Sequence, residues 1–253
     1  LVAHSAFAQR QLAEHGLPRS ERVVMGVDRQ LFAARPRPAN WGAPLRMISV
    51  GRLYEQKGHD LAIRTLALLR ARRPDLDVRL RIVGDGPRME SLNRLAEELS
   101  MRGFVTGPAP ARPLEVAAAL FGADLALVPS RVMADGWQEA FCRVAIEAMS
   151  TGLPVVATRS GGLPDTVGEG GVVAIREDAA ALADAAEAVL SAMGPADWAV
   201  RATRSAARFD IATKATTAIT FTGPAAGSAP GKTWSNYCAH RDSVLGYDEG
   251  TSA

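Results

Sequence analysis

Two glutamates and two cations are the residues with which this sequence could do chemistry. Glu139 and Glu147 stand eight residues apart around the expected start of a helix, which is roughly 12 Å along a helix axis. That spacing is too long for two carboxylates that share one proton, but it suits two hydroxyl-bearing rings, each bound by one carboxylate. Arg52 and Lys57 stand on one earlier loop, where a guanidinium and an ammonium could bind a pyrophosphate without a metal.

Both glutamates also have a purely structural interpretation. An acidic residue at a helix N-terminus, such as Glu139, is favourable by itself because it complements the helix dipole. Glu147 lies in the otherwise apolar sequence VAIEAM, and a carboxylate in such a turn needs a partner. The structural interpretation is therefore weaker for Glu147.

Two glycine loops follow predicted strands. Gly51 precedes Arg52, and Gly84 and Gly86 belong to the sequence GDGP. Each loop lies where a strand passes to a helix, so its backbone N–H groups could face a phosphate. Tight-turn chemistry is the commoner reason for a single glycine loop, but two loops with cations beside the first favour phosphate. A dinucleotide fold is disfavoured, because Met89 replaces the third glycine of its fingerprint.

Three further features are weaker signals. Asp75 and Asp77 have the spacing of a metal-nucleotide site, but they follow Pro74, so a solvated turn is favoured. The sequence GSAPGKT resembles a phosphate-binding loop, except that Ala226 stands in place of its first glycine. His59 could contact a phosphate, but a surface histidine at a helix start is commoner.

Short apolar runs alternate with stretches of helical spacing from Leu45 onward. Predicted strands cover 46–50, 78–83, 103–107, 124–128, 155–158 and 170–175, and predicted helices cover 59–73, 88–100, 114–121 and 178–193, with a further helix through Glu147. This alternation predicts an α/β fold with a doubly wound, Rossmann-like parallel sheet. The loops of interest then lie at the carboxyl edge of the sheet, where such folds bind ligands.

The two ends of the chain differ from this regular part. Residues 1–5 and 6–15 predict a strand end and a helix, and the proline-rich segment 32–44 has no periodicity and predicts a linker. Beyond Phe209 the sequence becomes Thr-rich and then polar without periodicity, which predicts a loosely held or disordered tail.

Composition excludes several classes of protein. The 253 residues are 47% hydrophobic, enough for a core, and the net charge of +2 gives no nucleic-acid footprint. Cys142 and Cys238 are far apart and have no histidine at ligand spacing, so neither a disulfide framework nor a zinc site is predicted and a reducing cytosol fits. No run approaches the roughly eighteen apolar residues of a membrane span.

A set of landmarks resembles the donor-binding half of a retaining glycosyltransferase of the GT-B fold, glycosyltransferase family four. In chain order they read HSAFAQRQLAEHGLP, GVDRQLF, GRLYEQKG, IVGDGP, FVTG, ADLALVPS, EAFCRVAIE, EAMSTGLPVVAT and GGLPD. The resemblance covers about residues 2–209. One landmark alone is weak, whereas this set in this order is highly specific.

The resemblance implies a role for each candidate residue. Arg52 and Lys57 would bind the pyrophosphate of the donor and stabilise it as leaving group, Glu139 would contact the transferred sugar, and Glu147 would hold the ribose hydroxyls. The remaining nucleotide-sugar-binding positions would be Gly51, Gly84 and Gly86 in the cleft, Val105 near the base, and the backbone of Ala140, Phe141 and Cys142 near sugar and phosphate.

The resemblance also divides the chain and implies its partners. Residues 1–34 would be a remnant of the N-terminal acceptor domain plus a linker, residues 35–208 the donor-binding domain, and residues 209–253 an irregular tail. The partners would be a nucleotide-sugar donor, a glycan, lipid-linked or small-molecule acceptor and the missing N-terminal domain, with no nucleic acid, no cofactor and no metal.

By the same resemblance the protein would be cytoplasmic, with peripheral attachment to the inner face of the membrane as an option, and this chain would be inactive alone. Two alternatives stay open. One is a non-catalytic nucleotide-sugar-binding module, and the weaker one is a sugar-nucleotide epimerase of related fold. The base, the sugar and the acceptor are not identified.

Overall fold

A computed structural model describes residues 1–23 and 25–210 of the chain. These residues belong to one compact unit, and a second unit, Ala218–Ala253, lies outside the described residues. The tail predicted over 209–253 therefore falls almost entirely outside them, and its irregular character stays a prediction.

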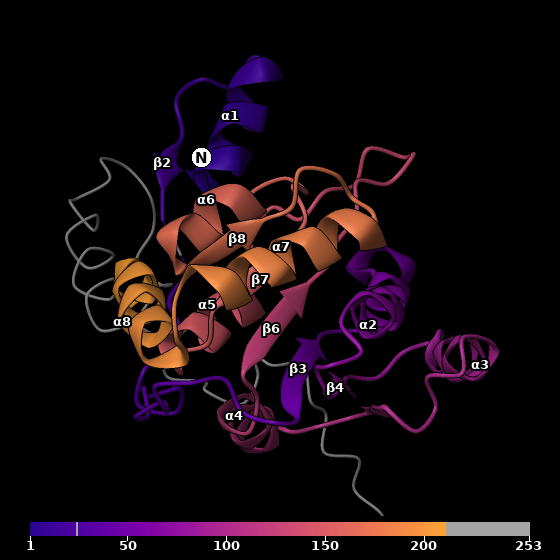
Figure 1. Ribbon diagram of the computed structural model, residues 1–253. Coiled ribbons are helices and arrows are strands. Elements are labelled where there is room, and N and C mark those ends of the chain that lie inside the picture. The colour runs from indigo at the N-terminus through magenta and orange to yellow at the C-terminus, as the bar shows by residue number, and fades with distance from the viewer. Residues whose placement is uncertain (24, 211–253) are drawn as a thin grey trace, which may run out of the picture. The chain divides into compact units, whose positions relative to one another are not determined.

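The centre of the fold is a six-stranded parallel sheet with the order β5-β4-β3-β6-β7-β8. Its strands are β3 (Leu45–Val50), β4 (Val78–Val83), β5 (Val105–Ala109), β6 (Leu125–Val128), β7 (Val155–Ala157) and β8 (Gly171–Val173). The chain starts in the middle, runs to one edge, returns to the middle and then runs to the other edge (Figure 1). This confirms the predicted doubly wound, Rossmann-like α/β fold.

Helices connect the strands and enclose two apolar cores, one on each face of the sheet. They are α2 (His59–Arg72), α3 (Met89–Glu98), α4 (Pro113–Phe121), α5 (Arg143–Ser150), α6 (Leu163–Val167), α7 (Ala179–Ala192) and α8 (Pro195–Ala206), with 3-10 turns η1 (Glu55–Lys57), η2 (Gly168–Gly170) and η3 (Ala207–Phe209). Residues of α2, α3 and α7 enter the first core, and residues of α4, α5, α6 and α8 enter the second. All four residues of β6 are buried, as a central parallel strand requires.

Helix α8 is absent from the sequence prediction, which places no element between 193 and 209. Its signals are present in hindsight: Pro195 lies at the first helical position, where proline is favourable. Trp198, Ala202 and Ala206 recur every four residues and are buried, which gives the helix one apolar face. The sequence on both sides of these positions is also rich in alanine, so the apolar periodicity of α8 does not stand out.

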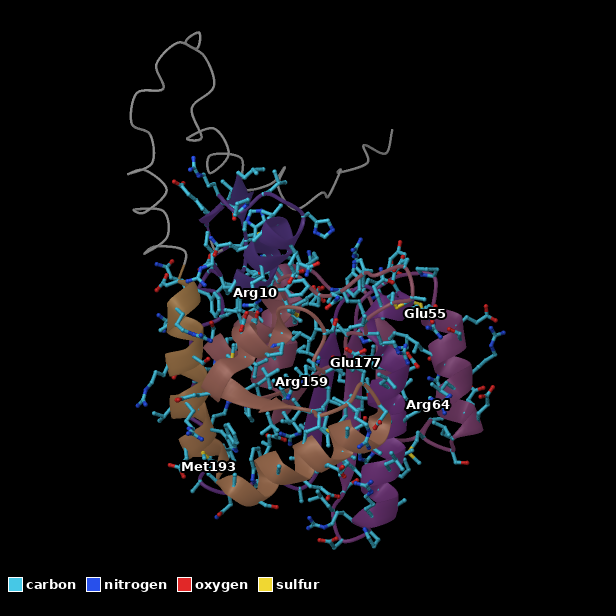
Figure 2. The ribbon with its side chains drawn as sticks, turned by 90° about the horizontal axis from the view of Figure 1, so that it is seen from above. Arg10, Glu55, Arg64, Arg159, Glu177 and Met193 are labelled. Atoms are coloured by element: carbon cyan, nitrogen blue, oxygen red, sulfur yellow. The ribbon has the colours of Figure 1, made fainter. Side chains whose placement is uncertain are left out.

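The N-terminal residues form a small unit beside the sheet. Strands β1 (Val2–Ala3) and β2 (Glu21–Arg22) pair in parallel, and α1 (Ala6–Glu14) connects them. Ser5 caps α1 by accepting a hydrogen bond from the Ala8 amide at 3.0 Å. Arg10 of α1, labelled in Figure 2, pairs with Asp165 of α6 at 3.0 Å, although both side chains are too exposed for a strong contribution.

The predicted linker is packed against the sheet domain. Phe32 is buried in the second core, and Arg37 donates hydrogen bonds to the carbonyls of Ala123 at 2.6 Å and Thr151 at 3.1 Å. Residues on both sides of the expected boundary between 34 and 35 therefore contact the sheet domain, while residues 33–36 are exposed. None of the helices in the described part of the chain is long and apolar enough to cross a membrane.

Candidate functional site

The candidate site lies where the winding of the sheet reverses. Strands β3 and β6 are neighbours, with Met47 beside Leu125, but the chain leaves them toward opposite edges of the sheet. At such a switch point the loops after the two strands border a crevice that binds ligands in open α/β sheets. Here those loops are 51–58 and 129–142, which carry three of the four predicted charged residues.

Lys57 and Glu139 meet across the two loops. The Nζ of Lys57, at the end of η1, lies 2.5 Å from Oε2 of Glu139, and the two side chains are only 21% and 7% exposed. Ser130 Oγ donates a second hydrogen bond to the same carboxylate oxygen at 3.0 Å. The structure thus joins a predicted phosphate ligand and a predicted sugar ligand, which are 82 residues apart in the chain.

The backbone around Glu139 is fixed from the loop that follows β7. The Glu139 amide donates to Ser160 Oγ at 3.2 Å, and its carbonyl accepts a hydrogen bond from the Gly162 amide at 2.7 Å. A Cβ on Gly162 would lie 2.5 Å from the carbonyl oxygen of Ala140. The glycine pair after β7 is therefore required by this close backbone approach.

A second ion pair joins the loop after β6 to the first turn of α2. Arg131 donates to both carboxylate oxygens of Asp60, at 2.8 and 2.5 Å, and its amide donates to the Gln56 carbonyl at 2.9 Å. Burial alone would raise the pKa of Asp60, but the hydrogen bonds and charge of Arg131 outweigh it and lower the pKa. Sequence reasoning did not find Ser130, Arg131 or Asp60, because their types carry no motif until the fold brings them together.

Arg52 is a cation of this site that has no anionic partner within the described part of the chain and could bind an anionic ligand. Its guanidinium lies 5.3 Å from the centre of the Tyr54 ring, and it makes no ion pair or side-chain hydrogen bond within the described part of the chain. Lys57, in contrast, is neutralised by Glu139. A ligand with two negative charges could bind Arg52 directly and compete with Glu139 for Lys57.

The backbone amides of the glycine loops donate hydrogen bonds within the chain. The amides of Gly51, Gly84 and Gly86 donate to Val83 O, Ala109 O and Asp85 Oδ1 respectively. A Cβ on Gly84 would lie 1.9 Å from the carbonyl oxygen of Gly51. These three amides therefore already have partners within the chain, as the tight-turn interpretation expects, and the two loops contact each other on either side of Arg52, at Gly51 and Leu53.

Glu147 lies in the second turn of α5 and is largely buried. Its side chain is 12% exposed, and Arg143 approaches its Oε1 at 3.5 Å. Burial raises the pKa of Glu147, and the charge of Arg143 offsets this only in part. Arg143 is therefore the partner that a carboxylate in this apolar sequence requires, although the distance of 3.5 Å is long for a hydrogen bond.

Replacing Glu147 with Gln is expected to stabilise the protein increasingly as pH rises. Because the pKa of the folded Glu147 is raised above its ordinary value of 4.5, the contribution of this group to the free energy of unfolding is most favourable below that value and declines as the buried carboxyl ionises. The Gln variant lacks this decline. Urea unfolding of both proteins from about pH 4 to about pH 8 should show a difference that grows with pH; a constant difference would contradict the assignment.

The residues between the two glutamates lead into α5. Phe141 packs edge-on against Phe209 at 5.8 Å. Cys142 is buried in the second core, and burial, together with the nearby charge of Glu139, raises the pKa of its thiol to about 12. The thiol is therefore protonated and inert at neutral pH.

Val105 does not join the site, which corrects the expected contact with the base. It begins β5, pairs with Leu80 inside the sheet and is 8% exposed. In a parallel sheet the crevice lies at the carboxyl ends of the strands, and the last residue of β5 is Ala109, whose carbonyl accepts the Gly84 amide. The prediction placed the strand at 103–107, two residues before its observed position, so Val105 is the first residue of β5 and not close to its carboxyl end.

His59 is buried, whereas the sequence favoured a surface histidine. It is 3% exposed, and Ser49 Oγ lies 3.0 Å from its Nδ1. Burial lowers the pKa of His59 to about 4, and the charge of Lys57 acts in the same direction. The imidazole is therefore neutral at pH 7 and supports the start of α2. Among residues 1–23 and 25–210, no group of three His, Cys, Asp or Glu is placed to hold a metal.

The chain is similar to known proteins in sequence and in fold. The family model described as "Glycosyl transferases group 1" matches residues 44–192. The chain is 38% identical over 177 residues to the putative colanic acid biosynthesis glycosyltransferase WcaL of Escherichia coli, covering 68% of this chain and 43% of that protein. It is 34% identical over 203 residues to a D-inositol 3-phosphate glycosyltransferase of Pseudarthrobacter chlorophenolicus, covering 75% of this chain and 47% of that protein.

The chain spans about half the length of these curated relatives. Among solved structures, Anabaena HepE in complex with UDP superimposes with a TM-score of 0.72 at 22% identity, covering 87% of this chain and 62% of that one. At this identity the likeness establishes the fold.

Proposed function

The chain belongs to the glycosyl transferases group 1 family, and from this membership we propose that it is the donor-binding part of a retaining glycosyltransferase of family four. Its six-stranded parallel sheet matches structures of the GT-B fold. The observation that carries the proposal is the charge arrangement at the switch point, where Arg52 is available and Lys57 lies 2.5 Å from Glu139.

The donor would lie along the crevice with its diphosphate between the two cations. Arg52 and Lys57 are near the carboxyl end of β3, so both can approach one diphosphate and spread its charge over two donors. Glu139 would bind hydroxyls of the transferred sugar, and Glu147 would bind those of the ribose. Gly84, Gly86 and the backbone of 140–142 would line the cleft, with the base near the end of β5.

In the proposed reaction the bond between the anomeric carbon and the diphosphate oxygen breaks, and an acceptor hydroxyl bonds to that carbon with retention of configuration. The negative charge that develops on the departing diphosphate would be stabilised by Arg52 and Lys57, without a cofactor or metal. We propose a hexose as the transferred group. The UDP and UDP-glucose in structures of Anabaena HepE support a nucleotide-sugar donor.

The remaining parts of the proposal concern the whole protein. Residues 1–34 would derive from the acceptor domain, residues 35–208 would form the donor domain, and a glycan, lipid-linked or small-molecule acceptor would bind to an N-terminal acceptor domain. The activity would serve glycan biosynthesis in the cytoplasm or at the inner face of the membrane. This chain alone would bind donor without turnover.

Calorimetry with UDP, GDP and ADP tests the proposal directly. Arg52→Ala and Glu147→Ala should each weaken the preferred nucleotide at least roughly tenfold, because each removes a charged hydrogen-bonding partner. Arg64 is an exposed residue of α2, labelled in Figure 2. Arg64→Ala removes a positive charge, as Arg52→Ala does, but away from the site, and it should leave the affinity unchanged. Unchanged affinity in both site variants would refute the proposal. Competition among UDP-, GDP- and ADP-sugars would then identify the donor.

Two alternatives can be distinguished by their reaction products. A non-catalytic module would bind the nucleotide sugar but show no transfer when co-expressed with an acceptor domain, whereas a transferase half should recover transfer. An epimerase would release free epimerised sugar without any acceptor.

A further inference from the structure

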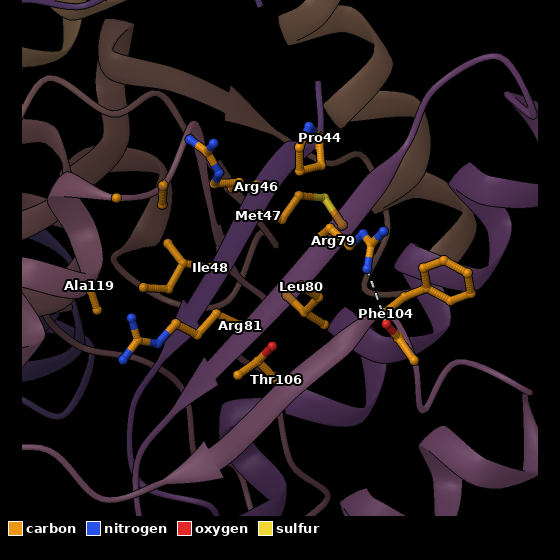
Figure 3. A pocket seen from close by; sticks show the side chains of 13 residues that line it. Pro44, Arg46, Met47, Ile48, Arg79, Leu80, Arg81, Phe104, Thr106 and Ala119 are labelled. Atoms are coloured by element: carbon orange, nitrogen blue, oxygen red, sulfur yellow. Dashed lines mark hydrogen bonds between the residues drawn. The ribbon is translucent and has the colours of Figure 1, made fainter. Parts of the chain in front are cut away.

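A cavity lies at the opposite end of the sheet from the candidate site. It has a volume of about 420 Å³ and lies against the first residues of β3, β4 and β5 beside α4 (Figure 3). Three arginines line it, Arg46, Arg79 and Arg81, and no carboxylate does. We call it the arginine cavity.

Within residues 1–23 and 25–210, one face of the sheet is left partly uncovered at this edge. In β4 the even-numbered residues 78, 80 and 82 are buried in the first core, while Arg79 and Arg81 on the other face are exposed. On that second face α4 packs against β3. A buried parallel strand normally has apolar residues on both faces. The two arginines therefore show that this face of β4 is exposed to solvent.

The three positive charges are close together. Arg46 and Arg79 are register partners on neighbouring strands and so project from the same face, and Arg81 lies beside Ile48 two residues further along. Like charges in such positions repel each other. Arg79 is compensated, since Asp77 accepts two hydrogen bonds from it at 3.0 and 3.1 Å.

The guanidiniums of Arg46 and Arg81 have no such partner among the described residues, while the Asp124 carboxylate accepts a hydrogen bond from the backbone amide of Arg46 at 2.8 Å. Within the described part of the chain, neither guanidinium makes an ion pair or a hydrogen bond. Figure 3 shows that they lie on either side of Ile48 and extend on the side of Ala119, whereas Arg79 turns away toward Gly103, whose carbonyl it contacts at 3.3 Å. Two unpaired guanidiniums thus border an apolar floor.

We propose that the arginine cavity binds a small organic phosphate. Guanidinium groups bind phosphate oxygens in a bidentate manner, and a dianion would neutralise the two unpaired charges. Ile48 and Ala119 would contact the organic part of the ligand. A carbohydrate or other neutral ligand would leave the mutual repulsion of the arginines in place.

This site is separate from the candidate donor site. Arg46 is five residues before Gly51 on β3, which corresponds to roughly 16 Å along the strand. One ligand can therefore occupy the arginine cavity while a nucleotide occupies the crevice at the switch point. The proposal stands even if the donor-binding function is refuted.

Phenyl phosphate is a suitable probe, because it combines a dianion with a small apolar body. Titration of the full chain, followed by amide NMR, should shift the resonances of Arg46, Arg81 and Thr106 in a saturable manner. The double variant Arg46→Gln/Arg81→Gln should weaken this binding at least tenfold, as expected for the loss of two charged hydrogen-bonding groups. Thr106 lines the cavity without a charge and reports on binding in both proteins.

Two matched controls locate the effect. Arg94→Gln removes a cation from the exposed face of α3, and Arg52→Gln removes one from the donor site; both should leave the shifts of Thr106 unchanged. The proposal is overturned if the double variant binds as the wild type does, or if saturable shifts occur only at residues 51–58. It is also overturned if vesicles of anionic phospholipid bind through Arg46 and Arg81 while phenyl phosphate does not.

Discussion

Replacing Lys57 with Met and Glu139 with Gln should move the affinity for a nucleoside diphosphate in opposite directions. Lys57 is neutralised by Glu139 at 2.5 Å, so a diphosphate must displace the carboxylate and is also repelled by it. The Lys57 variant loses a cation at the proposed phosphate position and should bind about 100-fold more weakly. The Glu139 variant frees Lys57 while its amide can still accept the Ser130 hydrogen bond, and it should bind roughly tenfold more tightly.

Calorimetry with the nucleotide that the wild-type protein prefers would measure both changes. Glu139 is 6% exposed, and the Lys57 variant leaves its charge without a cation, so thermal unfolding must show that each variant is folded at the titration temperature. A double variant closes the cycle and gives the coupling of the pair. If both single variants bind more weakly by similar factors, the ion pair supports the fold and does not compete with the ligand.

The order of elements could be predicted because each strand is short, apolar and bounded by glycine or proline. The strand VRLRIV was located to the residue, since Pro74 and the GDGP turn delimit it. Once the alternation is recognised, the parallel sheet and its ligand-binding edge follow from general rules. Arg52, Lys57 and Glu139 could be placed at that edge for the same reason.

What could not be predicted are contacts that depend on the register of two distant loops. Ser130 and Arg131 follow β6 and have ordinary loop types, so only the fold shows that one binds Glu139 and the other binds Asp60. The predicted contact between Val105 and the base was wrong for a related reason. The strand begins two residues later than predicted, which makes Val105 its first residue, and a residue at the start of a strand lies away from a site at the carboxyl edge of the sheet.

Gly84→Ala should be strongly destabilising, by about 3 kcal/mol or more. Gly84 has φ +151°, which side chains rarely adopt, and a Cβ there would lie 1.9 Å from the carbonyl oxygen of Gly51. Backbone atoms on both sides must move to relieve this contact. Gly103→Ala is the matched control, because nothing lies within 4 Å of its Cβ position, and it should change stability by less than about 1 kcal/mol.

Urea unfolding followed by circular dichroism would compare the two variants, with the midpoint as the measure of stability. The same experiment separates the two interpretations of the glycine loop. Because the Gly84 amide already donates to Ala109, the Gly84→Ala variant should lose nucleotide binding through displacement of Gly51 and Arg52, in proportion to the structural change. If that variant kept wild-type stability and still bound nucleotide poorly, the loop would instead contact the phosphate directly.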